Sequence, residues 1–181
     1  MYGNLYLVST PIGNLEDLTF RAVKVLGSVD IILAESVERT SKLLSHYDIN
    51  AKVISFNKDN EKRKIKSVIA FLEDSKNIAL VSDAGTPCVS DPGFYLLSNL
   101  NRDIKIIPIP GASSITCALA VSRIPMNGFT FLGFLPKKEN DRKNKLLQAY
   151  SSELPLCIFE SKHRLLDLFE EISSIFGEDT L

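Results

Sequence analysis

The loop of residues 82–93 is the segment of this sequence best suited to bind a ligand. It reads Ser-Asp-Ala-Gly-Thr-Pro-Cys-Val-Ser-Asp-Pro-Gly. Glycine and alanine have no bulky side chain, so a ligand can approach the backbone closely and its carboxylate can meet free amide groups. The end of the loop has a structural explanation, because Asp91 can cap a following helix and Pro92 suits the first helical position. The residues before it have none, and we expect four of them to contact a ligand: Asp83, Ala84, Gly85 and Thr86.

Two shorter loops have the same character. Residues 10–17 read Thr-Pro-Ile-Gly-Asn-Leu-Glu-Asp, in which Pro11 and Gly13 fix a tight turn and Asp17 can cap the next helix. Residues 110–114 read Pro-Gly-Ala-Ser-Ser, and the serines can open a helix. Each of these loops could also be a simple connection between two elements.

Several common chemistries lack their sequence signature. Neither GxGxxG nor GxxxxGK[ST] occurs, so a dinucleotide fingerprint and a phosphate-binding P-loop are not indicated. The nucleophile elbow GxSxG and the metalloprotease motif HExxH are also missing. His46 lies near the end of a predicted helix, a common surface position for histidine, and we assign it no role.

The composition is that of an ordinary globular protein, with 45% hydrophobic and 24% charged residues. The net charge of −1 argues against a protein that binds nucleic acid through its overall charge, so any RNA contact must be local. Cys88, Cys117 and Cys157 have no CxxC spacing, and we expect buried thiols in a reducing cytoplasm, without disulfides or a metal site. No apolar stretch approaches the roughly 20 residues that span a bilayer, which predicts a cytoplasmic protein with no membrane partner.

The elements that would hold these loops predict an α/β fold with a five-stranded, mainly parallel sheet and crossover helices. Short β-branched runs alternate with amphipathic segments of helical length. The predicted strands are residues 5–9, 31–35, 53–56, 78–82 and 105–109, and the predicted helices between them are residues 18–26, 40–47, 61–73 and 94–100. Because ligands bind outside the carboxyl ends of parallel strands, the three loops lie where a site is expected.

The rest of the chain predicts a partial second domain. After a linker helix at residues 113–121 and a turn at 125–128, we expect strands at 129–134 and 156–160 and helices at 141–150 and 163–176. Residues 1–111 would form the first domain, and residues 112–181 the linker helix with an incomplete α/β domain. A two-stranded sheet leaves an unpaired edge and a half-covered face, so we expect a truncated domain that dimerises or is unstable.

Four segments, in order along the chain, resemble the ribosomal RNA small subunit methyltransferase I family of the tetrapyrrole (corrin/porphyrin) methylase superfamily. They are residues 9–17, residues 82–87 with 90–93, residues 110–113, and Gly133-Phe134-Leu135-Pro136. The siroheme and corrin methyltransferases of the superfamily carry GxGPGD in place of the first segment. The resemblance implies two α/β domains that bind S-adenosylmethionine without a metal, at Pro11, Gly13, Asp83, Ala84, Gly85, Thr86, Asp91, Pro92, Gly111, Ala112 and Ser113.

The activity that the resemblance implies is methyl transfer to the ribose 2′-hydroxyl of a cytidine in the decoding region of 16S rRNA, within the small ribosomal subunit. Alignment of the reacting atoms can lower such a barrier by about 7–11 kcal/mol. A general base adds about 10²–10⁴-fold, and Glu35 or Asp83 could serve. The expected RNA contacts are Lys137, Lys138, Arg142, Lys143 and the neighbouring Lys145, with His163 and Arg164; the lysines could also be a solvated helix face.

The chain also departs from the family. Where the family has Ala-Glu-Asp-Thr-Arg, this chain has Ala-Glu-Ser-Val-Glu at residues 34–38, and Arg39 could replace the lost positive charge. Residues 160–164, Glu-Ser-Lys-His-Arg, keep the family pattern except at Lys162, although Ser161 could simply cap a helix there. The family continues beyond the position of Leu181. Two alternatives therefore stay open: a donor-binding remnant without catalysis, and a tetrapyrrole C-methyltransferase.

Overall fold

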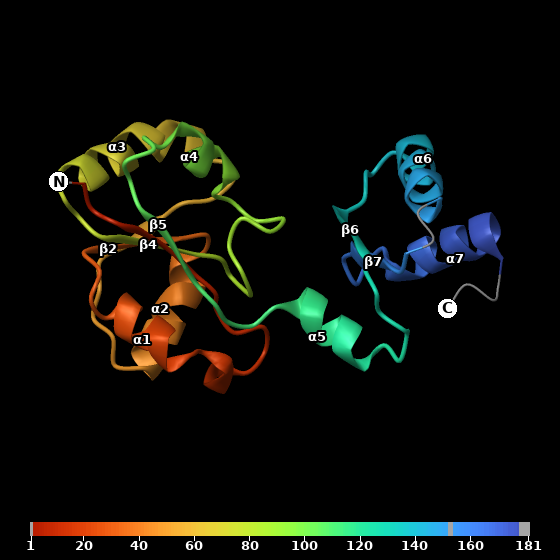
Figure 1. Ribbon diagram of the computed structural model, residues 1–181, viewed down its shortest axis with the longest axis horizontal. Coiled ribbons are helices and arrows are strands. Elements are labelled where there is room, and N and C mark those ends of the chain that lie inside the picture. Colours follow the sequence, from red (N-terminus) through yellow and green to blue (C-terminus); the bar gives the residue numbers. More distant parts are fainter. Residues whose placement is uncertain (1, 152–153, 178–181) are drawn as a thin grey trace. The chain divides into compact units, whose positions relative to one another are not determined.

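A computed structural model describes residues 2–151 and 154–177 of the chain (Figure 1). The chain forms two compact units, Met1–Ala118 and Leu119–Leu181. Each unit has its own sheet and its own apolar core.

Unit 1 is built on a five-stranded sheet in the order β3-β2-β4-β1-β5, with every strand pair parallel. The strands are β1 (Leu5–Val8), β2 (Ile31–Ala34), β3 (Val53–Ser55), β4 (Ile78–Val81) and β5 (Ile106–Ile109). All residues of β2 and β4 are buried, as expected of strands that are covered on both faces. The predicted fold class is confirmed. Of the three strands that lead into the candidate loops, β1 lies between β4 and β5.

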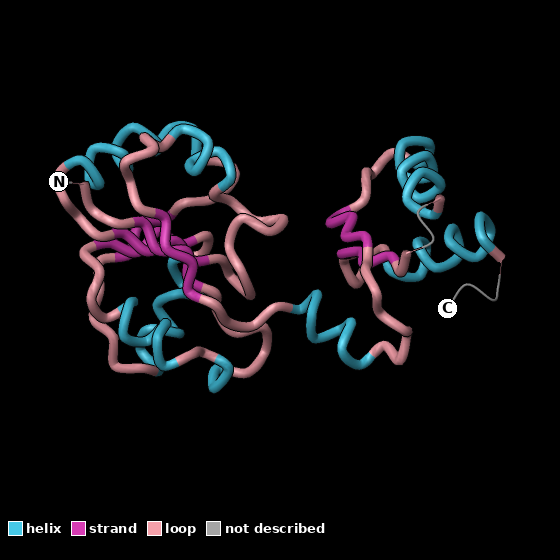
Figure 2. The backbone as a smooth tube through the Cα atoms, viewed as in Figure 1, coloured by secondary structure: helices cyan, strands magenta, loops and turns pink. Residues whose placement is uncertain are grey.

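Helices cover both faces of this sheet (Figures 1 and 2). Helices α1 (Phe20–Leu26) and α2 (Val37–His46) pack on one face, where Leu26, Leu43 and Leu44 meet Val8 and Ala34. Helices α3 (Glu61–Glu73) and α4 (Phe94–Asn99) pack on the other, where Leu72 and Leu96 meet Leu5 and Leu33. Alternate strand residues thus face opposite layers, so the sheet edge and its loops are held from both sides.

Two helix starts in unit 1 differ from the expectation because of capping. Asp17 does not cap α1; it ends a short 3-10 helix, η1 (Leu15–Asp17), and the Thr19 side chain accepts from the amide of Ala22 instead. Helix α2 begins before the predicted residue 40, because the Ser36 hydroxyl accepts from the Arg39 amide and starts the helix at Val37.

Unit 2 contains two parallel strands, β6 (Thr130–Phe134) and β7 (Leu156–Phe159), with helices α6 (Glu139–Tyr150) and α7 (Leu165–Phe176). Helix α5 (Ser114–Val121) precedes them and contains the boundary between the units. Leu135, Leu146 and Leu168 form the buried centre of unit 2. The alternative that Ser161 caps the last helix is wrong: Arg164 holds the cap position, with no capping bond from its side chain.

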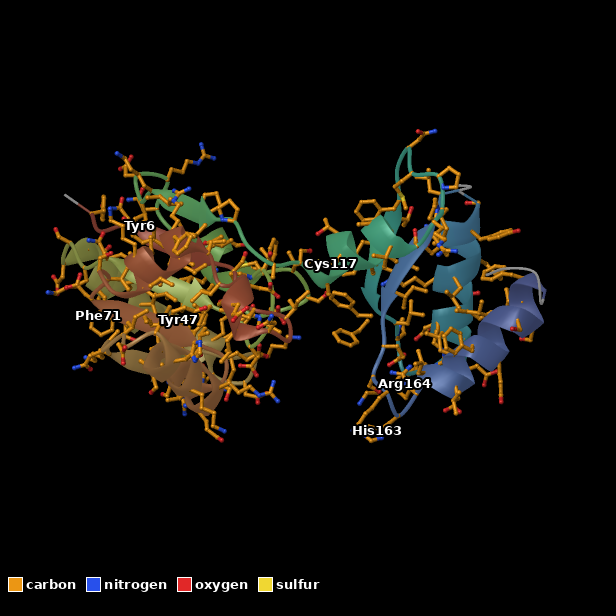
Figure 3. All side chains as sticks on the ribbon, turned by 90° about the horizontal axis from the view of Figure 1, so that it is seen from below. Tyr6, Tyr47, Phe71, Cys117, His163 and Arg164 are labelled. Carbon is orange, nitrogen blue, oxygen red and sulfur yellow. The ribbon has the colours of Figure 1, made fainter. Side chains whose placement is uncertain are left out.

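The cysteines and the apolar content of the helices were also the subject of predictions. The prediction of buried thiols is wrong for Cys117, which is exposed on α5 (Figure 3). Cys88 and Cys157 are half-buried. Within residues 2–151 and 154–177, no helix is both long and apolar enough to cross a membrane.

Candidate functional site

The three loops predicted to bind a ligand meet at the carboxyl ends of β1, β4 and β5. Thr10 and Gly85 exchange two backbone hydrogen bonds, of 2.9 and 3.0 Å, which join the first loop to the second. A Cβ atom on Gly85 would lie 3.5 Å from Cγ2 of Ile12 and 3.7 Å from the carbonyl oxygen of Ala112. The first, second and third loops are therefore in contact around Gly85.

Buried hydroxyl groups fix the first two loops to each other. The Thr10 hydroxyl donates to the carbonyl of Ser82 at 3.0 Å, and the Ser9 and Thr86 hydroxyl oxygens lie 3.1 Å apart. Ser82 in turn donates to the carbonyl of Gly85 at 3.1 Å. Because Ser9, Thr10 and Ser82 are almost fully buried, these bonds give the loops one defined conformation before any ligand binds.

Gly111 is required by the close approach of the third loop to the first. A Cβ atom at this position would lie 2.8 Å from Cβ of Ser9 and 3.4 Å from its carbonyl oxygen. No ordinary side chain can be added at that distance without moving the backbone. Gly13, by contrast, faces open space. Ser113 stands at the start of α5, where its carbonyl accepts from the amide of Cys117.

The second loop has an unusual backbone conformation. Gly85, Cys88, Ser90 and Gly93 have φ values of 79°, 69°, 66° and 123°. Positive φ is unfavourable for serine and cysteine, and such conformations cluster at functional sites, where the surroundings hold them in place. Three of them, Cys88, Ser90 and Gly93, lie within three residues of Asp91.

The end of this loop is held by Glu61, which the sequence analysis overlooked. The expectation that Asp91 caps the next helix is wrong, because Gly93 holds the cap position of α4. The buried Glu61 carboxylate, at the start of α3, accepts from the amides of Gly93 at 3.2 Å and Leu96 at 3.1 Å. Asp91 therefore does not have the capping role predicted for it.

Asp83 connects this loop to the loop after β2. One carboxylate oxygen accepts from the amide of Ser36 at 3.0 Å, and the other lies 3.2 Å from Nη1 of Arg39. Arg39 itself is 70% exposed, so this ion pair contributes at most about 1 kcal/mol. The backbone bond is the more important link, because it ties the end of β2 to the end of β4.

Three carboxylates gather at this edge of the sheet. Partial burial, the nearby Glu35 and, more weakly, Asp83 raise the pKa of Asp91 to about 6, against the opposing effect of Lys58. Burial is the largest cause of this shift and the neighbouring carboxylates add to it, so a cationic ligand at this edge would favour the ionised form of Asp91. Among the described residues, no group of three His, Cys, Asp or Glu side chains could hold a metal ion.

The basic residues expected to contact RNA in unit 2 differ in their surroundings. Arg142 forms a partly buried ion pair with Glu171 and also donates to the carbonyls of Pro136 and Lys137. Lys145 donates to the carbonyl of Leu132. The remaining lysines of the set are exposed: Lys137, Lys138 and Lys143.

His163 and Arg164 lie together in the turn after β7 (Figure 3). His163 is exposed, whereas Arg164 lies 3.3 Å from the carboxylate of Glu160, which is 3% exposed. The Arg164 charge is therefore partly neutralised inside unit 2. The ligand and RNA roles of all these residues stay predictions.

Comparison with known proteins relates the whole chain to one family. Residues 4–181 match the family model for tetrapyrrole (corrin/porphyrin) methylases. Proteins named ribosomal RNA small subunit methyltransferase I match at 46% identity in Buchnera aphidicola (subsp. Baizongia pistaciae), 42% in Escherichia coli O157:H7 and 45% in Thermotoga maritima, each over 97% of this chain. The chain spans 60%, 62% and 79% of the length of these three relatives.

Solved structures with low sequence identity have the same fold. A diphthine synthase superposes with a TM-score of 0.75 at 14% identity, over 97% of this chain and 73% of its own. A uroporphyrin III C-methyltransferase from Thermus thermophilus gives 0.67 at 18% identity, over 97% and 78%. The predicted tetrapyrrole-methylase-like fold is confirmed by these matches.

Proposed function

Because the chain belongs to the ribosomal RNA small subunit methyltransferase I family of the tetrapyrrole methylases, we propose that it transfers a methyl group from S-adenosylmethionine to small-subunit ribosomal RNA. The acceptor in this proposal is the ribose 2′-hydroxyl of a cytidine in the decoding region of 16S rRNA. The observation that carries it is the meeting of three small-residue loops at Gly85, on the strand edge where α/β sheets bind ligands.

The chemistry of this edge suits the proposed donor. S-adenosylmethionine supplies an activated methyl group on a sulfonium cation, and it also carries an ammonium group. The carboxylates of Glu35, Asp83 and Asp91 at this edge are complementary in charge to such a ligand. The small residues of the second and third loops give its flat and polar parts access to the backbone. Pro11, Gly13, Ala84, Thr86, Pro92, Ala112 and Ser113 complete the proposed binding set.

Glu35 is the better of the two candidate bases. Both carboxylate oxygens of Asp83 already have partners, Ser36 and Arg39, and serve to connect two loops. Glu35 lies at the end of β2, close enough to Asp91 to raise the pKa of that residue. In the proposed reaction the Glu35 carboxylate accepts the proton of the ribose hydroxyl, while the loops hold the reacting groups in line.

The proposal is tested by incubating the chain with methyl-labelled S-adenosylmethionine and small ribosomal subunits that lack the modification. We expect label in 2′-O-methylcytidine from the decoding region, identified by mass spectrometry of nuclease fragments. Label on a base, or none on RNA while uroporphyrinogen III accepts the methyl group, would refute RNA ribose methylation. Donor binding by calorimetry without any transfer would identify a remnant without catalysis.

Donor affinity is expected to increase with pH around the pKa of Asp91. A cationic ligand favours the ionised carboxylate, so binding must lower the Asp91 pKa from its value of about 6. Calorimetric titration with S-adenosylmethionine between pH 5 and pH 7.5, values chosen as roughly one unit or more on either side of that pKa, should show several-fold tighter binding at the higher pH. Asp91→Asn should remove most of this dependence.

The same pKa predicts the opposite trend for stability of the unliganded chain. The folded-state pKa of Asp91 lies above its ordinary value of 3.8. Its contribution to the free energy of unfolding is therefore fully present below pH 3.8 and is lost as the pH rises through about 6. Asp91→Asn should therefore unfold at a higher temperature than the parent at pH 7, with little difference at pH 4. A parent and variant that respond identically to pH would contradict the assignment.

A further inference from the structure

An aromatic and basic surface lies beside the donor loops on the α3 and α4 side of unit 1. We call it the α3–α4 patch, and it consists of Lys58, Lys62, Lys66, Phe94 and Tyr95. Phe94 is 74% exposed and Tyr95 39%. Single exposed aromatic residues are common on protein surfaces, but Phe94 and Tyr95 are adjacent and lie among lysines, and such a grouping is typical of an interaction site.

The lysines of the patch lie next to the aromatic rings. Nζ of Lys62 is 5.8 Å from the centre of the Tyr95 ring. Lys58 donates to the carbonyl of Ser90 at 2.8 Å, which places it at the loop that leads into α4. Lys66 is one helical turn after Lys62 and is therefore on the same stripe of α3.

Little negative charge offsets these lysines in the first half of α3. The Glu61 carboxylate points inward, where it accepts from Gly93 and Leu96. Asp59 is the exposed acid between Lys58 and Lys66, and Arg63 adds another exposed cation. The patch is thus locally positive on a chain whose net charge is −1.

The patch is continuous with the proposed donor site. Lys58 donates to Ser90, which directly precedes the proposed donor residue Asp91. Phe94 directly follows Gly93, whose amide donates to Glu61. The N-termini of α3 and α4 both lie at the edge of the sheet where the carboxyl ends of the strands are found (Figure 1). A polymer bound on the patch would therefore reach the edge where Glu35 and Asp83 lie.

We infer that the α3–α4 patch binds a single-stranded segment of the RNA substrate, whose bases stack on Phe94 and Tyr95 while its phosphates meet Lys62 and Lys66. Exposed aromatic faces combined with lysines are the recognition chemistry of unpaired RNA, because every base can stack and every linkage carries a negative charge. This inference rests on the proposed function and adds a substrate-binding surface in unit 1, separate from the basic residues of unit 2.

Two substitutions test the patch, each with a matched control on the opposite face of the sheet. Phe94→Ala is compared with Phe20→Ala, since each phenylalanine is exposed and is the first residue of a helix. Lys62→Glu is compared with Lys24→Glu, an exposed lysine of α1 and the same change of charge. Affinity for a short, fluorescently labelled single-stranded RNA is measured by anisotropy at several salt concentrations.

We expect Phe94→Ala to weaken RNA binding about tenfold, the typical effect of losing one stacked base. Lys62→Glu should also weaken it about tenfold and reduce the slope of log Kd against log salt by about 0.7, the value for one phosphate contact on a single strand. Both controls should bind as the parent does, and duplex RNA should bind more weakly than single-stranded RNA to the parent. The affinity for S-adenosylmethionine should be the same in all variants.

Three outcomes would overturn the inference: RNA affinity unchanged in both patch variants, equal losses in the controls, or a parallel loss of donor affinity that reveals a damaged loop. Failure of the proposed function has a different experimental result from failure of this inference. It would appear as a parent chain that binds no S-adenosylmethionine and transfers no methyl group, whatever its affinity for RNA.

Discussion

Gly111→Asp is expected to abolish binding of S-adenosylmethionine. Even the Cβ atom of the new side chain would lie 2.8 Å from Cβ of Ser9, so the first and third loops must separate. Ser9 cannot move alone, because its amide donates to the carbonyl of Ile109 at 3.3 Å and its hydroxyl lies 3.1 Å from that of Thr86. The rest of the aspartate side chain would then occupy space at the strand ends that the proposed donor needs. Calorimetry should show donor affinity at least about a hundredfold weaker, equivalent to about 3 kcal/mol.

The alanine variant separates geometry from charge. Gly111→Ala brings only the Cβ atom, and we expect a loss of about 1–3 kcal/mol in unfolding free energy together with a smaller loss of affinity. Gly27→Ala is the control, since a Cβ atom there meets its nearest neighbour at an ordinary 3.5 Å. A folded Gly111→Asp variant with the parent's donor affinity would mean that the third loop only connects β5 to α5.

The sheet of unit 1 could be predicted from the sequence because its strands are buried on both faces. Residues Ile31–Ala34 and Ile78–Val81 are unbroken apolar runs, and such runs bounded by turns indicate the central strands of a parallel sheet. Helix starts were less predictable. Ser36 and Thr19 decide where α2 and α1 begin, and both compete with other residues that could cap.

Contacts between residues distant in the sequence could not be predicted from local sequence patterns. Asp91-Pro92 has the sequence of a helix start. The amides at the start of α4 nevertheless donate to Glu61, which belongs to α3. A signal existed, because Glu61 shares the buried stripe of α3 with Ile65, Val68 and Leu72, where a carboxylate needs a partner. Arg142 has no such signal: it follows exposed lysines, and its partner Glu171 lies on α7.

Glu61→Ala is expected to destabilise unit 1 and weaken donor binding together. The substitution leaves the buried amides of Gly93 and Leu96 without an acceptor, at a cost of about 1–3 kcal/mol for each group. We therefore expect the free energy of unfolding to fall by about 2–4 kcal/mol in urea titrations. The loop around Asp91 loses its anchor at the same time, so donor affinity should fall at least about tenfold at temperatures where the variant is still folded.

Glu61→Gln distinguishes the hydrogen bonds from the charge. The glutamine oxygen can accept from the same two amides, so this variant should lose only about 1 kcal/mol, the difference between charged and neutral hydrogen bonds. Donor affinity should return close to that of the parent. If glutamine were as damaging as alanine, the negative charge itself would be required beside the donor loop. If neither variant weakened donor binding, Glu61 would stabilise α4 without positioning the loop that leads into it.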